Sequence, residues 1–273
     1  MATDSRAARL VPAKVRGSWG VIRRLAVRQI EMRYRDSFLG LGWAILAPLI
    51  LLIIYTIIYS TVFKARWPRP DGKEGNFALY IFSGLVLFVM VADLLNTATS
   101  LAQNNSTLIK RTTMNVRLIP IASSFGALMS FVLSLVPLLL MYVILEGVPP
   151  WTLILYPIPV AILWLASAGL AMIVASAAPY FRDAVQIVPL LTTSLLFLSP
   201  IFYSITAVPE PLRTIMVWLN PLATIIPASQ DLLFFGTFPP LVPLLGWGIA
   251  SVVIWWLGLT IFTRAARGFA DVM

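Results

Sequence analysis

RRLAVRQIEMRYRDSFLGLGWAILAP, at Arg23–Pro48, joins a basic segment to a long run without charge. At 3.6 residues per turn, apolar residues around this segment share one face, and the arginines at 24, 28 and 35 lie on the opposite face. The apolar face consists of Trp19, Ile22, Ala26, Ile30 and Tyr34. Such a helix is typical of a membrane surface, where each basic residue contributes about 1 kcal/mol near anionic lipid. We therefore predict a surface helix over residues 19–36, with a solvated cytoplasmic helix or a disordered basic tail as the alternative.

The composition places the chain among membrane proteins. Hydrophobic residues make up 59% and charged residues 11% of the 273 residues, and the mean hydropathy is +0.90, far above that of a soluble domain. The net charge of +9 could indicate nucleic-acid binding. However, the basic residues cluster beside apolar runs, where they set membrane orientation, so we expect no nucleic-acid partner. The absence of Cys and His excludes disulfides, thiol catalysis and Cys/His metal sites.

Apolar runs of membrane-spanning length recur along the chain. A helix needs about 20 apolar residues to cross a bilayer core. We predict one transmembrane domain over residues 19–264, with spans at 39–63, 78–102, 118–145, 153–178, 185–203 and 241–263. The Pro-, Gly- and charge-rich segment 64–76 is predicted to be a loop. Mobile cytoplasmic tails are expected at 1–18 and 265–273. The predicted fold class is therefore an all-α integral membrane protein with six transmembrane helices.

Residues 204–240 are apolar but broken by prolines. The prolines are Pro209, Pro211, Pro221, Pro227, Pro239 and Pro240. No piece between them is long enough to cross, so the pattern predicts a re-entrant helical hairpin buried against protein. Such backbone often borders a transport pathway, and a structural plug is an equal alternative.

Lysine and arginine residues give the orientation. Six spans place both termini on one side, together with 15 of the 20 Lys and Arg residues. The opposite side carries Lys64, Arg66, Arg69, Lys73 and Arg213. Because basic loops stay in the cytoplasm, both termini are predicted to be cytoplasmic and the hairpin periplasmic.

The interval after the second predicted span has the pattern of a short capped helix. Asn105 or Ser106 fits the N-cap, and the apolar pair Leu108 and Ile109 precedes a basic pair at 110–111. A short helix on the cytoplasmic side could dock on a soluble partner. A plain interhelical loop fits the spacing equally well.

Ionisable and aromatic residues within the spans are further candidates. Asp93 lies inside a predicted span, where a carboxylate costs about 2.5–3.5 kcal/mol. A transport role and a structural hydrogen bond to a neighbouring helix explain it equally well. Tyr55 and Tyr59 lie one turn apart, and their rings could stack on sugars or, more simply, pack on lipid.

The chain carries no recognisable energy source. It contains no phosphate-binding loop of the form G-x-x-x-x-G-K-[S/T], and few ionisable groups lie within the spans to carry a proton or sodium gradient. We therefore expect no catalytic residues and no metal site on this chain. A transport pathway here would draw its energy from another chain.

Five segments resemble the membrane subunit of bacterial ABC polysaccharide exporters, the ABC type-2 family that exports O-antigen, teichoic acid and related glycans. They are RYRDSFLGLGWAILAPL (Arg33–Leu49), LIKRTTMNVRLIP (Leu108–Pro120), YFRDAVQIV (Tyr180–Val188), SPIFY (Ser199–Tyr203) and LNPLATII (Leu219–Ile226). The resemblance covers nearly the whole chain in the same order and spacing. Two positions depart from it: Met114-Asn115 replaces a common Phe-Pro, and Ser229-Gln230 replaces a common Tyr-Arg before Asp231.

The resemblance implies a homodimer in the bacterial inner membrane, bound to two separate ATP-binding-cassette subunits that hold ATP and Mg²⁺. No cofactor is expected on this chain. It implies a gate helix at the predicted surface helix, a coupling helix over residues 104–114, and periplasmic re-entrant helices. The expected residues are Arg28, Arg33, Tyr34 and Arg35 at the gate; Tyr55, Tyr59, Phe202 and Tyr203 along the sugar path; Asn105, Leu108, Ile109, Lys110 and Arg111 in ATPase coupling; and Asp93 and Asp231 as intramembrane polar groups.

The expected function is export of an undecaprenyl pyrophosphate-linked polysaccharide, such as O-antigen, across the inner membrane. The chain would be a transport subunit and not an enzyme. Gate arginines would attract the pyrophosphate through charge-assisted hydrogen bonds. The alternatives are an ABC type-2 exporter of a drug or lipid, and a non-transporting membrane scaffold or enzyme.

Overall fold

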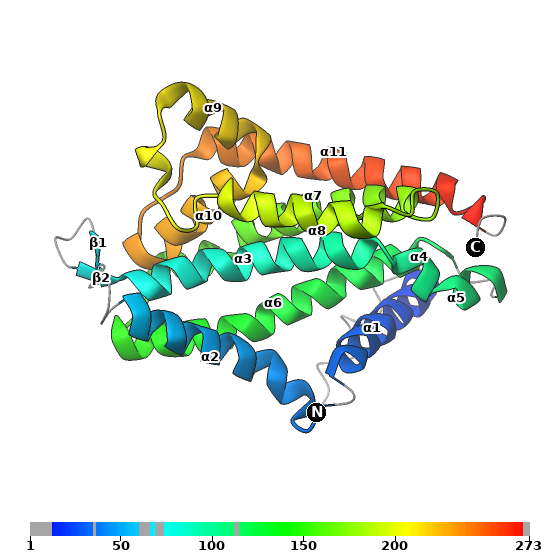
Figure 1. Cartoon of the computed structure of the whole chain (residues 1–273), viewed down its shortest axis with the longest axis horizontal. Coiled ribbons are helices and arrows are strands. Elements are labelled where there is room, and N and C mark those ends of the chain that lie inside the picture. The colour runs from blue at the N-terminus through cyan, green and yellow to red at the C-terminus, as the bar shows by residue number, and fades with distance from the viewer. Residues whose placement is uncertain (1–12, 35–36, 60–65, 69–73, 112–114, 270–273) are drawn as a thin grey trace.

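The computed structural model describes residues 13–34, 37–59, 66–68, 74–111 and 115–269. Long helices run side by side along the longest axis of the molecule (Figure 1). The α-helices are α1 (Ala13–Tyr34), α2 (Trp43–Ile57), α3 (Phe77–Ala98), α4 (Leu101–Asn104), α5 (Ser106–Arg111), α6 (Leu118–Leu145), α7 (Pro157–Ala177), α8 (Ala184–Phe197), α9 (Glu210–Leu219), α10 (Pro221–Gln230) and α11 (Leu241–Ala265). The all-α prediction is therefore confirmed for the body of the protein.

Short elements join these helices. Single 3-10 turns form η2 (Gly40–Gly42), η4 (Trp151–Leu155) and η5 (Ile205–Ala207), and a π-helical turn forms η6 (Asp231–Phe235). Strands β1 (Arg66–Pro68) and β2 (Glu74–Asn76) pair antiparallel, with Trp67 opposite Gly75. This pairing corrects the prediction of an irregular loop at 64–76, because its two ends form a small hairpin.

Within the described part of the chain, four helical segments are long and apolar enough to cross a membrane: Phe77–Ala98, Leu118–Leu145, Trp151–Ala177 and Leu241–Ala265. They coincide with four of the six predicted spans. The other two predicted spans contain the shorter apolar helices α2 and α8, of 15 and 14 residues. At 1.5 Å per residue, each of these reaches about 22 Å, which is less than the roughly 30 Å hydrocarbon core. The six-span count therefore stays a prediction.

Helix α3 lies at the centre of the bundle. It contacts α2, α6, α7, α8 and α10, and 83% of its most apolar 18-residue stretch is buried. A helix that is apolar on all sides is expected in such a central position. Asn76 caps it, because the side-chain oxygen accepts hydrogen bonds from the backbone N–H groups of Ala78 (3.0 Å) and Leu79 (3.3 Å).

Helices α7 and α11 form the most extensive contact between two helices, and it depends on glycine. A Cβ atom at Gly169 would lie 2.6 Å from the backbone of Ile254, and a Cβ atom at Gly258 would collide with the carbonyl oxygen of Gly169. Small residues let membrane helices approach until their backbones touch, which maximises van der Waals contact. The two glycines thus fix the distance between α7 and α11.

The two ends of the bundle carry different elements. The β-hairpin, α9 and α10 lie at one end, whereas α4, α5 and the C-terminal end of α11 lie at the other (Figure 1). Asn220 turns the chain between α9 and α10: its side-chain oxygen accepts from the N–H of Leu222 (3.0 Å), and its amide donates to the oxygens of Leu198 and Ser199 (both 3.1 Å). Two short helices are therefore present where the sequence predicts a hairpin.

Candidate functional site

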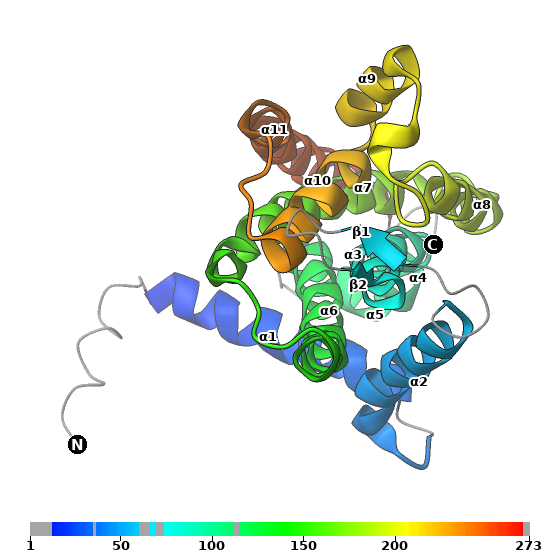
Figure 2. The same ribbon diagram turned by 90° about the vertical axis from the view of Figure 1, so that its left-hand side faces the viewer.

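Helix α1 lies across the bundle and packs on α6. In Figure 2, which looks along the long helices, α1 is seen from the side. Its apolar residues Ile22, Ala26 and Ile30 are buried, and the side-chain amide of Gln29 donates to Ser123 Oγ (3.2 Å). The predicted amphipathic helix is present, but protein covers its apolar face. The position of this helix at the membrane surface stays a prediction.

Trp19 differs from the rest of that face. Its ring packs edge-on against Phe125 of α6, with ring centroids 5.1 Å apart, yet 53% of the residue stays exposed. Gly126 lies beside this contact, where a Cβ atom would come within 3.1 Å of the Gln29 side-chain oxygen. The close approach of α1 to α6 therefore depends on a small residue in α6.

The cationic face of α1 remains exposed. Arg23, Arg24 and Arg28 are all exposed, and Arg24 Nε donates to the carbonyl oxygen of Gly20 (3.2 Å). Of the predicted gate residues, the structure places Arg28. The side chains of Arg33 and Tyr34, and the whole of Arg35, lie outside the described residues.

A cavity of about 650 Å³ lies between α1, α6 and the α3–α5 segment. Its volume falls within the range of about 300–1,000 Å³ that is typical of small-molecule sites. Its lining is mixed, and Arg28 is the one ionisable side chain among the described residues that line it. The polar residues in the lining are Gln29, Thr97, Asn104, Asn105 and Ser123, and the apolar residues are Leu25, Leu101, Leu108, Ile119 and Ala122. The cavity thus joins a predicted gate residue to two predicted coupling residues.

The predicted coupling segment is two short helices. Helix α5 covers residues 106–111, whereas 112–114 lie outside the described residues. The side chain of Asn105 donates to the carbonyl oxygen of Leu101 (2.8 Å) and so caps the end of α4. The prediction that Asn105 or Ser106 caps the following helix stays a prediction.

Leu108 and Ile109 are half-buried and pack against the core of this chain. Only part of each side chain is therefore available to a partner. The side chains of Lys110 and Arg111 lie outside the described residues. Nothing in the structure tests whether this segment binds an ATPase, and that role stays a prediction.

The predicted aromatic residues form two separate groups. Tyr55 and Tyr59 contact each other with ring centroids 6.1 Å apart, and Tyr59 contacts Phe77 at 5.3 Å. Phe202 packs on the core after α8, and the Tyr203 hydroxyl donates to the carbonyl oxygen of Phe197 (3.3 Å). Both groups are half-buried, so packing within the protein accounts for much of their surface.

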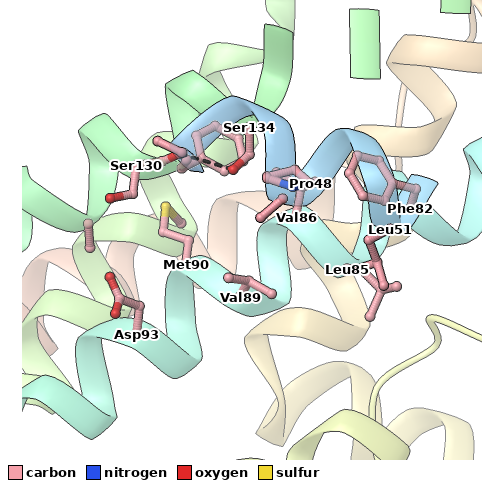
Figure 3. Close-up of a pocket in the computed structure, with 14 residues that line it drawn as sticks. Pro48, Leu51, Phe82, Leu85, Val86, Val89, Met90, Asp93, Ser130 and Ser134 are labelled. Atoms are coloured by element: carbon pink, nitrogen blue, oxygen red, sulfur yellow. Dashed lines mark hydrogen bonds between the residues drawn. The ribbon is translucent and has the colours of Figure 1, made fainter. Parts of the chain in front are cut away.

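The two predicted intramembrane carboxylates belong to different regions. Asp93 lines a second cavity, of about 330 Å³, between α2, α3 and α6 (Figure 3). Asp231 lies in η6, outside the four candidate spans, and burial raises the pKa of its carboxyl to about 6. The neighbour of Asp231, Gln230, donates to the carbonyl oxygen of Tyr80 (3.1 Å), and Tyr80 is 13 residues before Asp93 on α3, or about 20 Å along the helix. The two acids therefore do not form one site.

The position that departs from the exporter pattern has a structural explanation. Gln230 is buried, and its amide nitrogen donates to the carbonyl oxygen of Tyr80 (3.1 Å) and to Ser83 Oγ (3.4 Å). A neutral amide at this depth avoids the cost of burying a charge. Met114 of the other departure lies outside the described residues.

Sequence reasoning missed three polar residues of the large cavity. Gln29, Thr97 and Ser123 come from three different helices. Thr97 and Asn104 are seven residues apart, close to two helical turns, which places them near one face of a helix. That spacing could have indicated polar side chains on one face at the end of the second span.

A bundle with four helical segments long and apolar enough to span a membrane, among the described residues, is the architecture of a multi-pass membrane protein. The family described as ABC-2 type transporter matches residues 21–234, which is most of the chain. The protein belongs to the ABC-2 type transporter family.

The curated relatives are named as export or transport proteins. The chain is 28% identical over 254 residues to the O-antigen export system permease protein RfbA of Myxococcus xanthus, covering 92% of this chain and 95% of the relative. It is 25% identical over 250 residues to the protein of the same name from Klebsiella pneumoniae, covering 90% and 92%. It is 22% identical over 250 residues to the polysialic acid transport protein KpsM of Escherichia coli, covering 87% and 90%. The chain is therefore a permease-type transport subunit of a membrane transporter.

Proposed function

We propose that this chain is the membrane subunit of an ATP-driven exporter that moves an undecaprenyl pyrophosphate-linked polysaccharide, such as O-antigen, from the cytoplasm to the periplasm. The names of the relatives support the polysaccharide as substrate. The chain itself has no Walker-type loop. Two ATP-binding-cassette subunits would therefore bind ATP and Mg²⁺ and drive a homodimer of this chain.

The large cavity is the observation that carries this proposal. Arg28 offers a cationic group to a phosphate, and Gln29, Asn104 and Asn105 add amide groups around it. Leu108 of α5 lines the same cavity. A movement of α5 driven by an ATPase would therefore change the shape of the space that holds the head group. ATP hydrolysis and the head-group site would then be coupled directly through α5.

Deletion of the gene tests the substrate class. If the proposal is right, a lipid-linked glycan accumulates in the cytoplasmic leaflet and surface glycan disappears, and expression of this chain restores export. Normal surface glycan in the deletion strain would contradict the proposal. A drug or phospholipid that accumulates in its place would assign the chain to the alternative class of ABC-2 exporter.

Arg28→Gln is expected to reduce export about tenfold, since a charge-assisted contact to phosphate contributes about 1.5–3 kcal/mol. The measurement is surface glycan per copy of the protein in the membrane. Arg24→Gln is the matched control, because Arg24 lies on the same exposed face but bonds to Gly20 and does not line the cavity. Equal export by the two variants would show that Arg28 does not contribute to binding of the head group.

The proposed topology has six spans, both termini in the cytoplasm and a periplasmic re-entrant region at 204–240. Because the chain lacks cysteine, single cysteines can be labelled without background. In intact spheroplasts, an impermeant maleimide is expected to label Glu210→Cys, whose side chain is exposed, and to leave Ser5→Cys unlabelled until the membrane is permeabilised. Labelling of Ser5→Cys in sealed spheroplasts would refute this orientation.

A further inference from the structure

The two cavities share the same two walls. The apolar cavity lies between α3 at residues 82–93 and α6 at residues 127–134, and α2 covers it. The large cavity lies between the next turns of the same walls, Thr97–Asn105 and Ile119–Ser123, and α1 covers it. Asp93 and Thr97 are one helical turn apart, as are Ser123 and Ala127. The two cavities therefore follow one another along a single furrow between α3 and α6, which we call the α3–α6 groove.

The groove changes in polarity along its length. Its α1 end carries Arg28 and five uncharged polar side chains. Its α2 end is lined mainly by aliphatic and aromatic residues such as Leu51, Phe82 and Val86 (Figure 3). Side chains from α2, α3 and α6 converge on this end, and the Ser134 hydroxyl there is already bonded to the carbonyl oxygen of Ser130 (3.0 Å). The α2 end thus suits a hydrocarbon chain.

Asp93 lies where the two parts meet, as the last α3 residue that lines the apolar cavity. An anionic group is favoured at the end that carries the Arg28 guanidinium over the apolar end beyond Asp93. The groove is thus polarised for a molecule with an anionic head and an apolar tail.

We propose that the α3–α6 groove holds the lipid carrier of the exported substrate lengthwise, with the pyrophosphate at Arg28 and the first isoprene units in the apolar cavity beside Ser130. This inference rests on the proposed function. The cavity volumes, about 650 and 330 Å³, both lie in the range of about 300–1,000 Å³ that is typical of ligand sites. Hydrocarbon burial holds the tail, and the cation at the mouth selects an anionic lipid over a neutral one.

Cysteine protection tests the inference on the full-length chain in phospholipid nanodiscs. Single cysteines are introduced as Thr97→Cys at the polar end, Ser130→Cys at the apolar end and Ser194→Cys on the exposed face of α8 as the control. The maleimide reaction rate is measured with farnesyl pyrophosphate, inorganic pyrophosphate or farnesol. Should Ser130→Cys fail to fold, Ser134→Cys replaces it, since Ser134 lines the same cavity.

At ten times its Kd, farnesyl pyrophosphate leaves roughly one tenth of the sites unoccupied. It is therefore expected to slow the maleimide reaction at both groove positions by roughly tenfold. Inorganic pyrophosphate is expected to protect Thr97→Cys only. Farnesol should protect Ser130→Cys more weakly than farnesyl pyrophosphate does, and Ser194→Cys should react at one rate throughout.

Each negative result of the cysteine-protection experiment would overturn a different part of the proposal. Protection by farnesyl pyrophosphate at Thr97→Cys alone would overturn the groove and leave the head-group site of the proposed function standing. Protection at neither position would overturn both. Equal protection of Ser194→Cys, or of Ser130→Cys by farnesol, would show that prenyl chains enter from the bilayer without an anchored head group, and would also overturn the inference.

Discussion

Replacing Gly258 by leucine is expected to prevent α11 from docking on α7 and to remove most of the folded protein from the membrane. A side chain at Gly258 meets the carbonyl oxygen of Gly169, and a Cβ atom at Gly169 would lie 2.6 Å from the backbone of Ile254, one turn before Gly258 on α11. Backbone atoms cannot move aside as a flexible side chain can, so the two helices must separate. Overpacking a close-packed interior costs about 1–3 kcal/mol of folding free energy. Because α7 and α11 touch along much of their length, we expect the loss in this variant to reach or exceed the upper end of that range.

The measurement is the midpoint of thermal unfolding of the purified chain in detergent, together with its level in the membrane. Gly248→Ala is the matched control on the same helix, because the nearest atom to its new Cβ would be Ile162 Cδ1 at 3.8 Å, an ordinary contact. The control is expected to unfold at the original temperature or slightly above it, since alanine is favoured over glycine in a helix by about 0.5–1 kcal/mol. If Gly258→Leu unfolded at the same temperature as the control, the close α7–α11 contact would be refuted.

The positions of the long helices could be predicted from the sequence because charged residues bound them. The third predicted span and α6 coincide at 118–145, since Arg117 and Glu146 enclose an apolar run that carries no charge. The boundaries of the second span were less accurate. The predicted span 78–102 is interrupted after Ala98, and a separate α4 begins at Leu101. Hydropathy does not register this break, because Leu101 and Ala102 are as apolar as the helix before them.

What covers an apolar face could not be predicted from periodicity. The spacing of Ile22, Ala26 and Ile30 defines a face but is equally compatible with lipid and with protein. The structure shows that α6 covers it, and the contact requires Gly126 and Ser123 on a helix about 100 residues away in sequence. For the same reason the large cavity could not be predicted, because its walls come from three segments that become neighbours only after folding.

The gate and coupling segments were predicted as separate parts, and the structure brings them to one cavity. Arg28 had been assigned to the gate and Leu108 to coupling, yet both line the same space. A head group bound at Arg28 would therefore contact the element that an ATPase is proposed to move. The apolar pair in α5 is therefore expected to seat α5 on the bundle as well as to contact the ATPase.

Leu108→Asp combined with Ile109→Asp is accordingly expected to abolish coupling. The two side chains are half-buried on the core of this chain, and complete burial of a leucine or isoleucine contributes about 1.5–3 kcal/mol. Two carboxylates at these positions would release α5 from the bundle and also repel an apolar groove on the ATPase, where buried anchors carry most of the binding energy. Glycan-stimulated ATP turnover of the reconstituted complex is expected to fall to the unstimulated rate, and co-purification of the ATPase should weaken.

Lys110→Gln is the matched control next to this pair, and it is expected to change turnover much less, because a single charge at the rim of an interface contributes about 1 kcal/mol or less. Leu108→Ala with Ile109→Ala separates the two contributions of the apolar pair, since it weakens the seat of α5 without adding charge. An intermediate loss of coupling in the alanine variant would show that coupling depends both on the packing of α5 against the bundle and on its contact with the ATPase. Wild-type turnover and co-purification in the double aspartate variant would show instead that the ATPase drives this chain through another surface, such as the exposed turn at Tyr180–Asp183 or the basic face of α1.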